Sequence, residues 1–469
     1  MKDRKIIKIL TNFNLKERKA FFRYVSSPYF NTNQKITDLL SYIYRFSPDY
    51  EDKNFTIEKA FQQLFKKEPF NERIITRLIS KLFKLAEDFI CTSKNEKDSF
   101  TRNIYLLEYY YNNQMTAFFD PVHKKLNADN EASTIKDDNY YYKKYLTEFH
   151  YIRLITRDDR RDTPINLNKL ISALDAQYWI RKLSLLSAKV NHQILVKHQV
   201  IDNSETEYVL QYLKNHDLQK IPAVQISYCA LELLNDPTVA SYPRFKEILS
   251  EHHTSFPVVQ VQNFYNILIN SIPNCFSGVN ERLEEYFRIF SEQIDLGYIY
   301  SNGYILPQAL KNVMTVALRL KKYKWAASFL ESNKEKILSR EVYFWNLSAL
   351  LYEKGDYEKS LELLMETKYN DTFYLLSTKR LLIKIYYQLD YNELLHSFIN
   401  TFRVFISRKK LPEEKKEQNQ LFLNFLSKLI KLQPHQQKEF KALLLKIEAI
   451  PDVAEQKWLI DETRKKLKS

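Results

Sequence analysis

Histidines and paired carboxylates are the side chains in this chain with the widest chemical use, in proton transfer and in metal binding. The nine histidines show no HExxH sequence and no other metal-ligand spacing to a carboxylate or cysteine. The adjacent pairs Asp137–Asp138 and Asp158–Asp159 would point about 100° apart on a helix, so they do not converge on one ligand. The sequence therefore nominates no catalytic residue, no metal site and no cofactor.

Glycine is nearly absent, with four residues in a chain of 469 and the first of them at Gly278. Phosphate-binding GxxxxGK[ST] loops, dinucleotide-binding GxGxxG turns and GxSxG nucleophile elbows all need glycine where the backbone turns sharply or approaches a substrate. None of these motifs can be written in this sequence. We therefore expect a protein that is not an enzyme. An enzyme whose site is assembled from distant helices is the less favoured alternative.

The same scarcity of glycine predicts an all-α fold, because helices joined by short polar turns need few positions with positive φ. We expect helical hairpins stacked as an α-solenoid in the C-terminal part and an irregular helical bundle at the N-terminus. Polar breaks and prolines divide the chain into an N-terminal helical domain (1–92), a Tyr-rich helical segment (93–164), irregular helical hairpins (165–306), a repeat region (307–405), and a C-terminal hairpin with a capping helix (406–469).

A period of 34 residues runs through the repeat region, where it separates Tyr323, Tyr357 and Tyr391. In the middle unit, Gly355 and the residues after it predict a turn between two helices. Ser348 and Ser360 are small enough to let those two helices approach closely. A fixed period of this length is the signature of stacked helical hairpins, which bury a continuous core between neighbours.

These units resemble the tetratricopeptide repeat, a 34-residue helix hairpin with a W-x2-L-G-x2-Y first helix and an A-x3-F second helix. The middle unit carries the match at Phe344, Leu347, Ser348, Leu351, Ser360 and Leu364. The resemblance implies a concave groove, formed by the first helices, in which a ligand peptide lies.

Carried onto the matching positions, the resemblance implies a groove that presents cations beside aromatic rings. The groove residues are Lys311, Arg319, Trp345, Tyr352, Lys379, Tyr386 and Tyr387. Such a surface suits an extended peptide that is acidic or ends in a carboxylate. We expect a scaffold or adaptor that binds protein or peptide partners there. The alternative for some of these residues, Trp345 above all, is packing between helices.

The chain is basic, with a formal net charge of +14, and its densest basic segment is the N-terminus. A nucleic-acid-associated regulatory protein is therefore the alternative function. Its phosphate-contacting residues would be Lys2, Arg4, Lys5, Lys8, Lys16, Arg18, Lys19 and Arg23. The competing interpretation is two amphipathic helices with solvated cations. Tyrosines interleaved with lysines in the Tyr-rich segment could stack on bases, although burial in a helix bundle explains them as well.

Localisation is predicted from the cysteines and from the absence of targeting segments. The three cysteines, Cys91, Cys229 and Cys275, are far apart and odd in number, so we expect buried thiols in a reducing compartment. The N-terminus has no apolar run typical of a signal peptide, and no stretch of the chain is long and apolar enough to insert into a membrane. We therefore expect a cytoplasmic protein.

Overall fold

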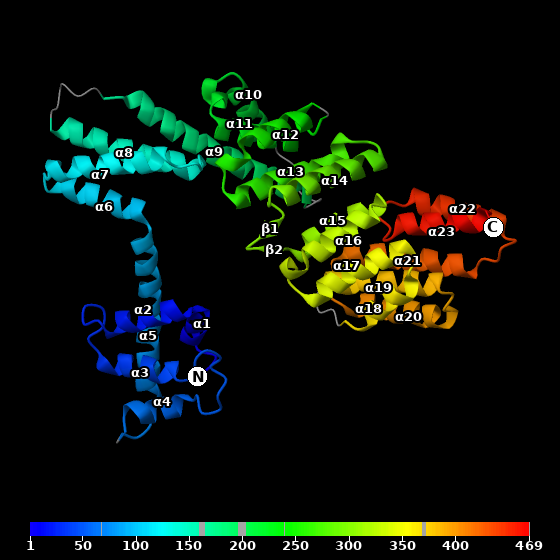
Figure 1. The fold of residues 1–469 in the computed structure, drawn as a ribbon, viewed down its shortest axis with the longest axis horizontal. Helices are drawn as coiled ribbons and strands as arrows, with labels where there is room; N and C mark the ends of the chain where they lie inside the picture. Colours follow the sequence, from blue (N-terminus) through cyan, green and yellow to red (C-terminus); the bar gives the residue numbers. More distant parts are fainter. Residues whose placement is uncertain (67, 159–164, 196–202, 239, 368–371, 469) are drawn as a thin grey trace. The chain divides into compact units, whose positions relative to one another are not determined.

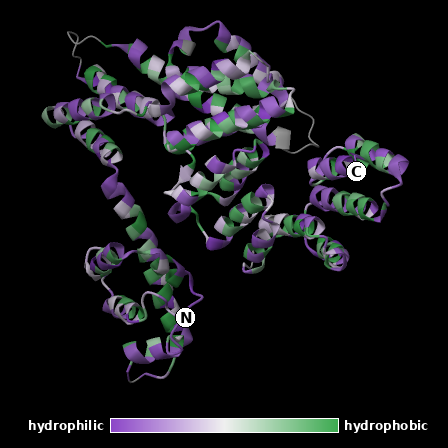
Figure 2. Cartoon of the chain, turned by 45° about the vertical axis from the view of Figure 1, so that its right-hand side comes forward, coloured by the Kyte–Doolittle hydropathy of each residue, from purple (hydrophilic) through white to green (hydrophobic). Residues whose placement is uncertain are grey.

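The computed structural model describes residues 1–469 except 67, 159–164, 196–202, 239, 368–371 and 469. The described chain is all-α apart from one short hairpin of two strands, as predicted (Figure 1). Apolar and polar residues alternate around most helices, the pattern of helices that bury one face (Figure 2). By its internal contacts the chain divides into two compact units, Met1–Leu183 and Ser184–Ser469.

The first unit begins with five helices, of which four short ones surround one long one. These are α1 (Lys5–Asn12), α2 (Leu15–Ser26), α3 (Gln34–Tyr44), α4 (Ile57–Leu64) and α5 (Glu72–Lys97). Each of α1 to α4 contacts α5. Phe13, Phe21 and Phe89 meet in the core with ring centroids 5.3 to 5.7 Å apart. A capping box is present at the start of α2, where Asn14 accepts from the Glu17 N–H and the Glu17 carboxylate accepts from the Asn14 N–H.

Helix α5 continues through position 92, where the sequence suggested a boundary, and ends at Lys97. Asp98 then caps α6 (Ser99–Asn112), which packs with α7 (Thr116–Glu131) and α8 (Asp138–Arg157). Helix α9 (Leu167–Leu195) contains the division between the two units. The first two predicted segments and the start of the third therefore belong to one compact unit.

The second unit starts with helices that pack in order along the chain. They are α10 (Ser204–Lys214), the 3₁₀ turns η1 (Asp217–Lys220) and η2 (His253–Ser255), α11 (Pro222–Asn235), α12 (Ser241–His252), α13 (Val258–Cys275) and α14 (Val279–Asp295). Pro222 opens α11 in its first turn, the position where a missing N–H costs nothing. Cys229 and Cys275 are buried as expected, but the expectation for Cys91 was wrong, because this thiol is exposed.

The strands β1 (Tyr300–Ser301) and β2 (Tyr304–Ile305) form an antiparallel hairpin just before the repeat region. The repeat region and the C-terminus then consist of α15 (Pro307–Arg319), α16 (Tyr323–Ser332), η3 (Lys334–Lys336), α17 (Arg340–Lys354), α18 (Tyr357–Met365), α19 (Thr372–Gln388), α20 (Asn392–Arg408), α21 (Glu413–Lys431), α22 (Gln437–Ala449) and α23 (Gln456–Lys468). Adjacent helices pack as hairpins, and the first helices α15, α17 and α19 contact one another in turn.

Small side chains set the distance between the two helices of the middle hairpin, as the sequence predicted. Ser348 on α17 and Ser360 on α18 are both fully buried, and the Ser360 hydroxyl donates to the Ser348 carbonyl at 2.8 Å. Ala326 on α16 is fully buried at the matching position of the preceding unit. A side-chain hydroxyl can reach the backbone of the neighbouring helix only where the two helices lie close together.

Each hairpin turn contains one residue in the left-handed region, and only one of the three is glycine. These residues are Lys321 (φ 56°), Gly355 (φ 87°) and Asp390 (φ 54°). In each turn an N–H donates to the carbonyl five residues earlier: Lys322 to Ala317, Asp356 to Leu351 and Tyr391 to Tyr386. In the first two turns the donor is the residue just before the repeat tyrosine. In the third turn the donor is the repeat tyrosine, Tyr391, itself. The first helix of the third unit is therefore shifted by one residue relative to the 34-residue period.

Opposite substitutions in these turns are expected to have opposite effects on stability. Gly355→Ala should lower the free energy of unfolding by about 1 kcal/mol, because a left-handed conformation is costly for a residue with a Cβ. A Cβ at Gly355 meets no heavy atom within 4 Å, so this backbone cost is the only one. Lys321→Gly should raise the free energy of unfolding by about 0.5 kcal/mol, since it relieves the same cost at the expense of unfolded-state entropy. Urea unfolding checks both, and an unchanged Gly355→Ala variant would contradict the assigned turn geometry.

Candidate functional site

The first helices of the repeat place cations and aromatic rings side by side. Lys311 of α15 lies with its ammonium 4.5 Å from the ring centroid of Trp345 on α17 and 5.5 Å from that of Tyr374 on α19. The same ammonium donates to the Ser377 hydroxyl. Lys311 and Trp345 are one 34-residue period apart. Because the third unit is shifted by one residue, the equivalent position on α19 is Arg380 and not Lys379. We call the surface formed by Lys311, Trp345, Tyr352, Ser377, Arg380, Lys384 and Tyr387 the first-helix face.

A carboxylate from the C-terminal part of the chain lies on this face. Glu455, the residue before α23, accepts from Arg380 Nε at 3.1 Å with Oε1 and from Lys384 Nζ at 2.9 Å with Oε2. The guanidinium is held in place by the Asn419 amide oxygen at 2.9 Å and the Ser377 hydroxyl at 3.2 Å. Charge-assisted hydrogen bonds of this kind are about twice as strong as neutral ones.

An aromatic side chain three residues later covers the neighbouring part of the face. Trp458 donates its indole N–H to the Tyr352 hydroxyl at 2.9 Å. Its ring stands edge-on to Tyr387 with centroids 5.3 Å apart, an arrangement favoured by the ring quadrupoles. Lys384 lies 5.0 Å from the centroid of Tyr352, so the cation that pairs with Glu455 also contacts the tyrosine that accepts from Trp458.

Electrostatics favour the ionised form of Glu455. Burial by itself disfavours the charged form, but the ammonium of Lys384 and the guanidinium of Arg380 outweigh it and lower the pKa of this carboxyl to about 2. Burial raises the pKa of the Tyr387 hydroxyl to about 12 and the pKa of Tyr352 well above its ordinary value. At neutral pH the face therefore holds one carboxylate between two cations, beside neutral phenols.

The seven groove residues predicted from the sequence do not share one surface. Lys311, Trp345, Tyr352 and Tyr387 belong to the first-helix face, and the first three are less than a tenth exposed. Arg319 is exposed at the end of α15. Lys379 lies over the rings of Phe398 and Phe405 on α20, at 5.2 and 4.8 Å, and Tyr386 stands edge-on to Phe398.

The one-residue shift of the third unit explains the positions of Lys379 and Tyr386. A step of one residue turns a side chain by about 100° around a helix, which is enough to move it from one neighbour to another. The residues of α19 that lie on the first-helix face are accordingly Arg380 and Tyr387, one position later. Burial between α19 and α20 also lowers the pKa of Lys379. Sequence reasoning missed Ser377, Arg380 and Lys384, and no signal in the sequence pointed to Glu455 or Trp458.

The basic N-terminal residues fall into two groups. Lys2 pairs with Glu51, Arg4 lies 3.9 Å from Glu72, and Arg18 donates to the Ser47 hydroxyl. The other five are exposed on α1 and α2 and have no acidic partner among the described residues: Lys5, Lys8, Lys16, Lys19 and Arg23. Large apolar side chains lie exposed on or next to α2, with Leu15 at 75% and Tyr29 at 87% exposed.

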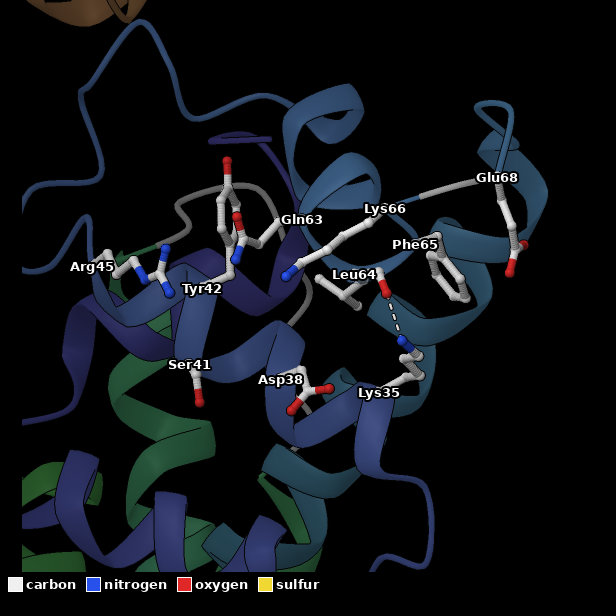
Figure 3. Close-up of a pocket in the computed structure, with 10 residues that line it drawn as sticks. All are labelled: Lys35, Asp38, Ser41, Tyr42, Arg45, Gln63, Leu64, Phe65, Lys66 and Glu68. Atoms are coloured by element: carbon white, nitrogen blue, oxygen red, sulfur yellow. Dashed lines mark hydrogen bonds between the residues drawn. The ribbon is translucent and has the colours of Figure 1, made fainter.

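The same bundle contains an open pocket of about 570 Å³ between α3 and the end of α4 (Figure 3). Lys35 closes one side, donating to the Leu64 carbonyl and lying 4.9 Å from the Phe65 centroid. Its other lining residues include Arg45, Lys66 and Glu68, so charges of both signs border it. The mixed charge and open shape give this pocket no preference for one class of ligand.

The Tyr-rich segment turns its aromatic rings toward its own cations. Tyr111 contacts two guanidinium groups, with Arg153 at 4.5 Å and Arg157 at 4.6 Å from its centroid. His123 is buried and stacks on Tyr151 at 4.2 Å, and burial lowers its pKa. Within the described ranges, no group of three or more His, Cys, Asp and Glu side chains is placed to hold a metal ion. No helix in the described part is long and apolar enough to cross a membrane.

Comparisons with family models, with curated proteins and with solved structures found no match to this chain.

Proposed function

We propose that this chain is a non-enzymatic helical-repeat scaffold or adaptor of the cytoplasm, with repeats of the tetratricopeptide type, that binds a protein or peptide partner on its first-helix face. The observation that carries the proposal is the capture of Glu455 and Trp458 from a distant part of the chain. Glu455 is 71 residues from Lys384 and 75 from Arg380 in sequence. A surface that binds a carboxylate and an indole from the same chain has the chemistry to bind them from another.

The test is a selection of displayed random peptides with the full-length chain, followed by hydrogen-exchange mapping of the tightest binder and of its scrambled control. We expect selected sequences that combine acidic and aromatic residues, and protection of amides in α15, α17 and α19 by the selected peptide only. A selection that enriches no peptide, or protection confined to other helices, would contradict the proposal.

A second candidate function, association with nucleic acid through the N-terminal bundle, is favoured by one observation. Residues 1–97 contain 20 Lys and Arg against 12 Asp and Glu, so about a fifth of the chain carries a net charge of +8 out of +14. The five unpaired cations on α1 and α2 form the exposed part of this charge. Phosphate contacts of this kind release counterions and make binding strongly dependent on salt.

Binding of a single-stranded oligonucleotide tests this candidate. Its affinity should fall by orders of magnitude between about 50 and 200 mM salt. Lys16→Glu with Lys19→Glu should weaken binding much more than Lys409→Glu with Lys410→Glu, which makes the same change of net charge at exposed positions outside the bundle. Equal effects of the two double variants, or no binding at low salt, would count against an N-terminal nucleic-acid site.

A further inference from the structure

We infer that Glu455–Trp458 is an internal ligand of the first-helix face, and that the external partner is a peptide with an acidic residue three positions before an aromatic residue, which binds in exchange for it. This inference rests on the proposed function. It goes further in naming the chemistry and spacing of the partner and in making the C-terminus of the chain its competitor.

The spacing of the partner follows from the contacts of the internal segment. The Glu455 carboxylate lies on two cations of α19, while the Trp458 indole reaches the Tyr352 hydroxyl on α17. The two recognition points are thus on adjacent first helices and are bridged by four consecutive residues. A peptide that presents the same two groups at the same spacing can make the same contacts.

The surface is prepared for a carboxylate independently of Glu455. Arg380 is oriented by Ser377 of its own helix and by Asn419 of α21, which is almost fully buried and donates in turn to the Lys415 carbonyl. These partners fix the guanidinium with its Nε toward Glu455. Orientation of this kind reduces the conformational entropy that a ligand must overcome on binding.

Glu455–Trp458 does not supply hydrogen-bond partners for all the polar groups of the first-helix face. The indole N–H of Trp345, which is only 7% exposed, has no hydrogen-bond partner among the described residues. The hydroxyl of Tyr387 on α19 is likewise buried and unpartnered in the described part of the chain. An indole can only donate, so a backbone carbonyl of a bound peptide is the partner that fits it. Buried polar groups without partners are rare in native structures, and a bound peptide would supply the partners that these two groups lack.

The backbone that presents the internal ligand is strained. Asp452 and Glu455 have φ values of 60° and 53°, in the left-handed region that non-glycine residues seldom adopt. Strained conformations persist where the surrounding contacts impose them, and they cluster at ligand clamps and switch regions. The two strained residues lie in the turn between α22 and α23, so release of Glu455 would relax the backbone that carries it.

The experiment measures binding of a labelled synthetic peptide copying residues 450–463 to the full-length chain. We compare the unaltered chain with Glu455→Gln, which removes the charge, and with Trp458→Phe, which removes the N–H donor and part of the aromatic ring. The second variant serves where the first fails to fold. Glu448→Gln is the matched control, because Glu448 lies on the same hairpin but pairs with Arg464 at an exposed position.

The peptide should bind Glu455→Gln and Trp458→Phe at least about tenfold more tightly than it binds the unaltered chain or Glu448→Gln, because a tethered competitor acts at an effective concentration in the millimolar range. A peptide with lysine in place of its glutamate should not bind. Equal affinity for all four proteins would overturn the exchange. If the peptide bound none of the four proteins, Glu455–Trp458 would be a permanent packing contact and the inference would be wrong. A peptide from the library that binds α15, α17 and α19 regardless of Glu455 would leave the proposed function standing and overturn this inference alone.

Discussion

Replacing Glu455 by glutamine is expected to lower the free energy that holds the C-terminal hairpin on α19 by about 3 kcal/mol at neutral pH. A shift of the carboxyl pKa from 4.5 to about 2 corresponds to roughly this free energy, at about 1.4 kcal/mol per unit. The substitution also leaves Arg380 and Lys384, whose side chains are 18% and 12% exposed, without their counter-charge. Native-state hydrogen exchange of amides in α19 and α23 measures the effect.

The free energy by which Glu455 holds the C-terminal hairpin on α19 depends on pH in a defined direction. The unfolded carboxyl takes up its proton at higher pH than the folded one, so the contribution of Glu455 is fully present above about pH 4.5 and is lost as the pH falls toward 2. Lys384 and Arg380 are the cations that face the carboxylate, and Glu353 is a nearby carboxyl whose own pKa is raised by burial. The difference between the unaltered chain and Glu455→Gln should shrink across this window. A difference in stability that stays constant with pH would contradict the ion pairs of Glu455. The control variant Glu448→Gln should change stability by less than about 1 kcal/mol over the whole pH range.

Replacing Ser360 by leucine is expected to lower the free energy of unfolding of the repeat region by about 2 to 4 kcal/mol. The residue is fully buried where α18 meets α17, so added methylene groups must push the helices apart or force unfavourable rotamers. Ser360→Ala is the matched control, because it removes only the hydrogen bond to the Ser348 carbonyl and should cost about 1 kcal/mol. Urea unfolding followed by tryptophan fluorescence reports on this region through Trp325, Trp345 and Trp458. A well-tolerated leucine would show that the two helices are not closely packed.

The helical architecture could be predicted because it depends on local patterns. The scarcity of glycine and the apolar periodicity indicated helices. Helix starts also have local signals, such as the capping box at Asn14 and the proline in the first turn of α11. The hairpin at Tyr300–Ile305 was missed although its turn, Asn302–Gly303, is a strong local signal with positive φ at both residues. Its strands are two residues long, too short for the alternation by which strands are recognised.

The candidate site could be predicted only in part, because its geometry depends on helix register and on distant contacts. The 34-residue period relates Lys311 to Trp345 but places the third unit one residue early. The shift arises in the last turn, where Asp390 rather than the residue before it takes the left-handed conformation. Glu455 and Trp458 have no local signature, since what distinguishes them is contact with residues 71 to 106 positions away.

The division of charge along the chain fits two separate binding regions. Residues 1–97 and 406–469 together carry the whole net charge of the chain, and the residues between them are neutral overall. The selectivity for carboxylates that we propose for the first-helix face would therefore come from the placement of Arg380, Lys384 and Lys311, and not from a general excess of positive charge. The two proposed binding functions are consequently separable by mutation.

The most direct measurement is hydrogen exchange of the full-length chain during titration with a peptide that carries glutamate three residues before tryptophan. If the peptide binds by replacing Glu455–Trp458, amides at the start of α23 should exchange faster as the peptide saturates the chain, while amides of α17 and α19 stay protected. Binding that leaves the exchange of α23 unchanged, or the absence of any binding, would contradict the conclusion that the repeat binds its partner on the surface its own C-terminus covers.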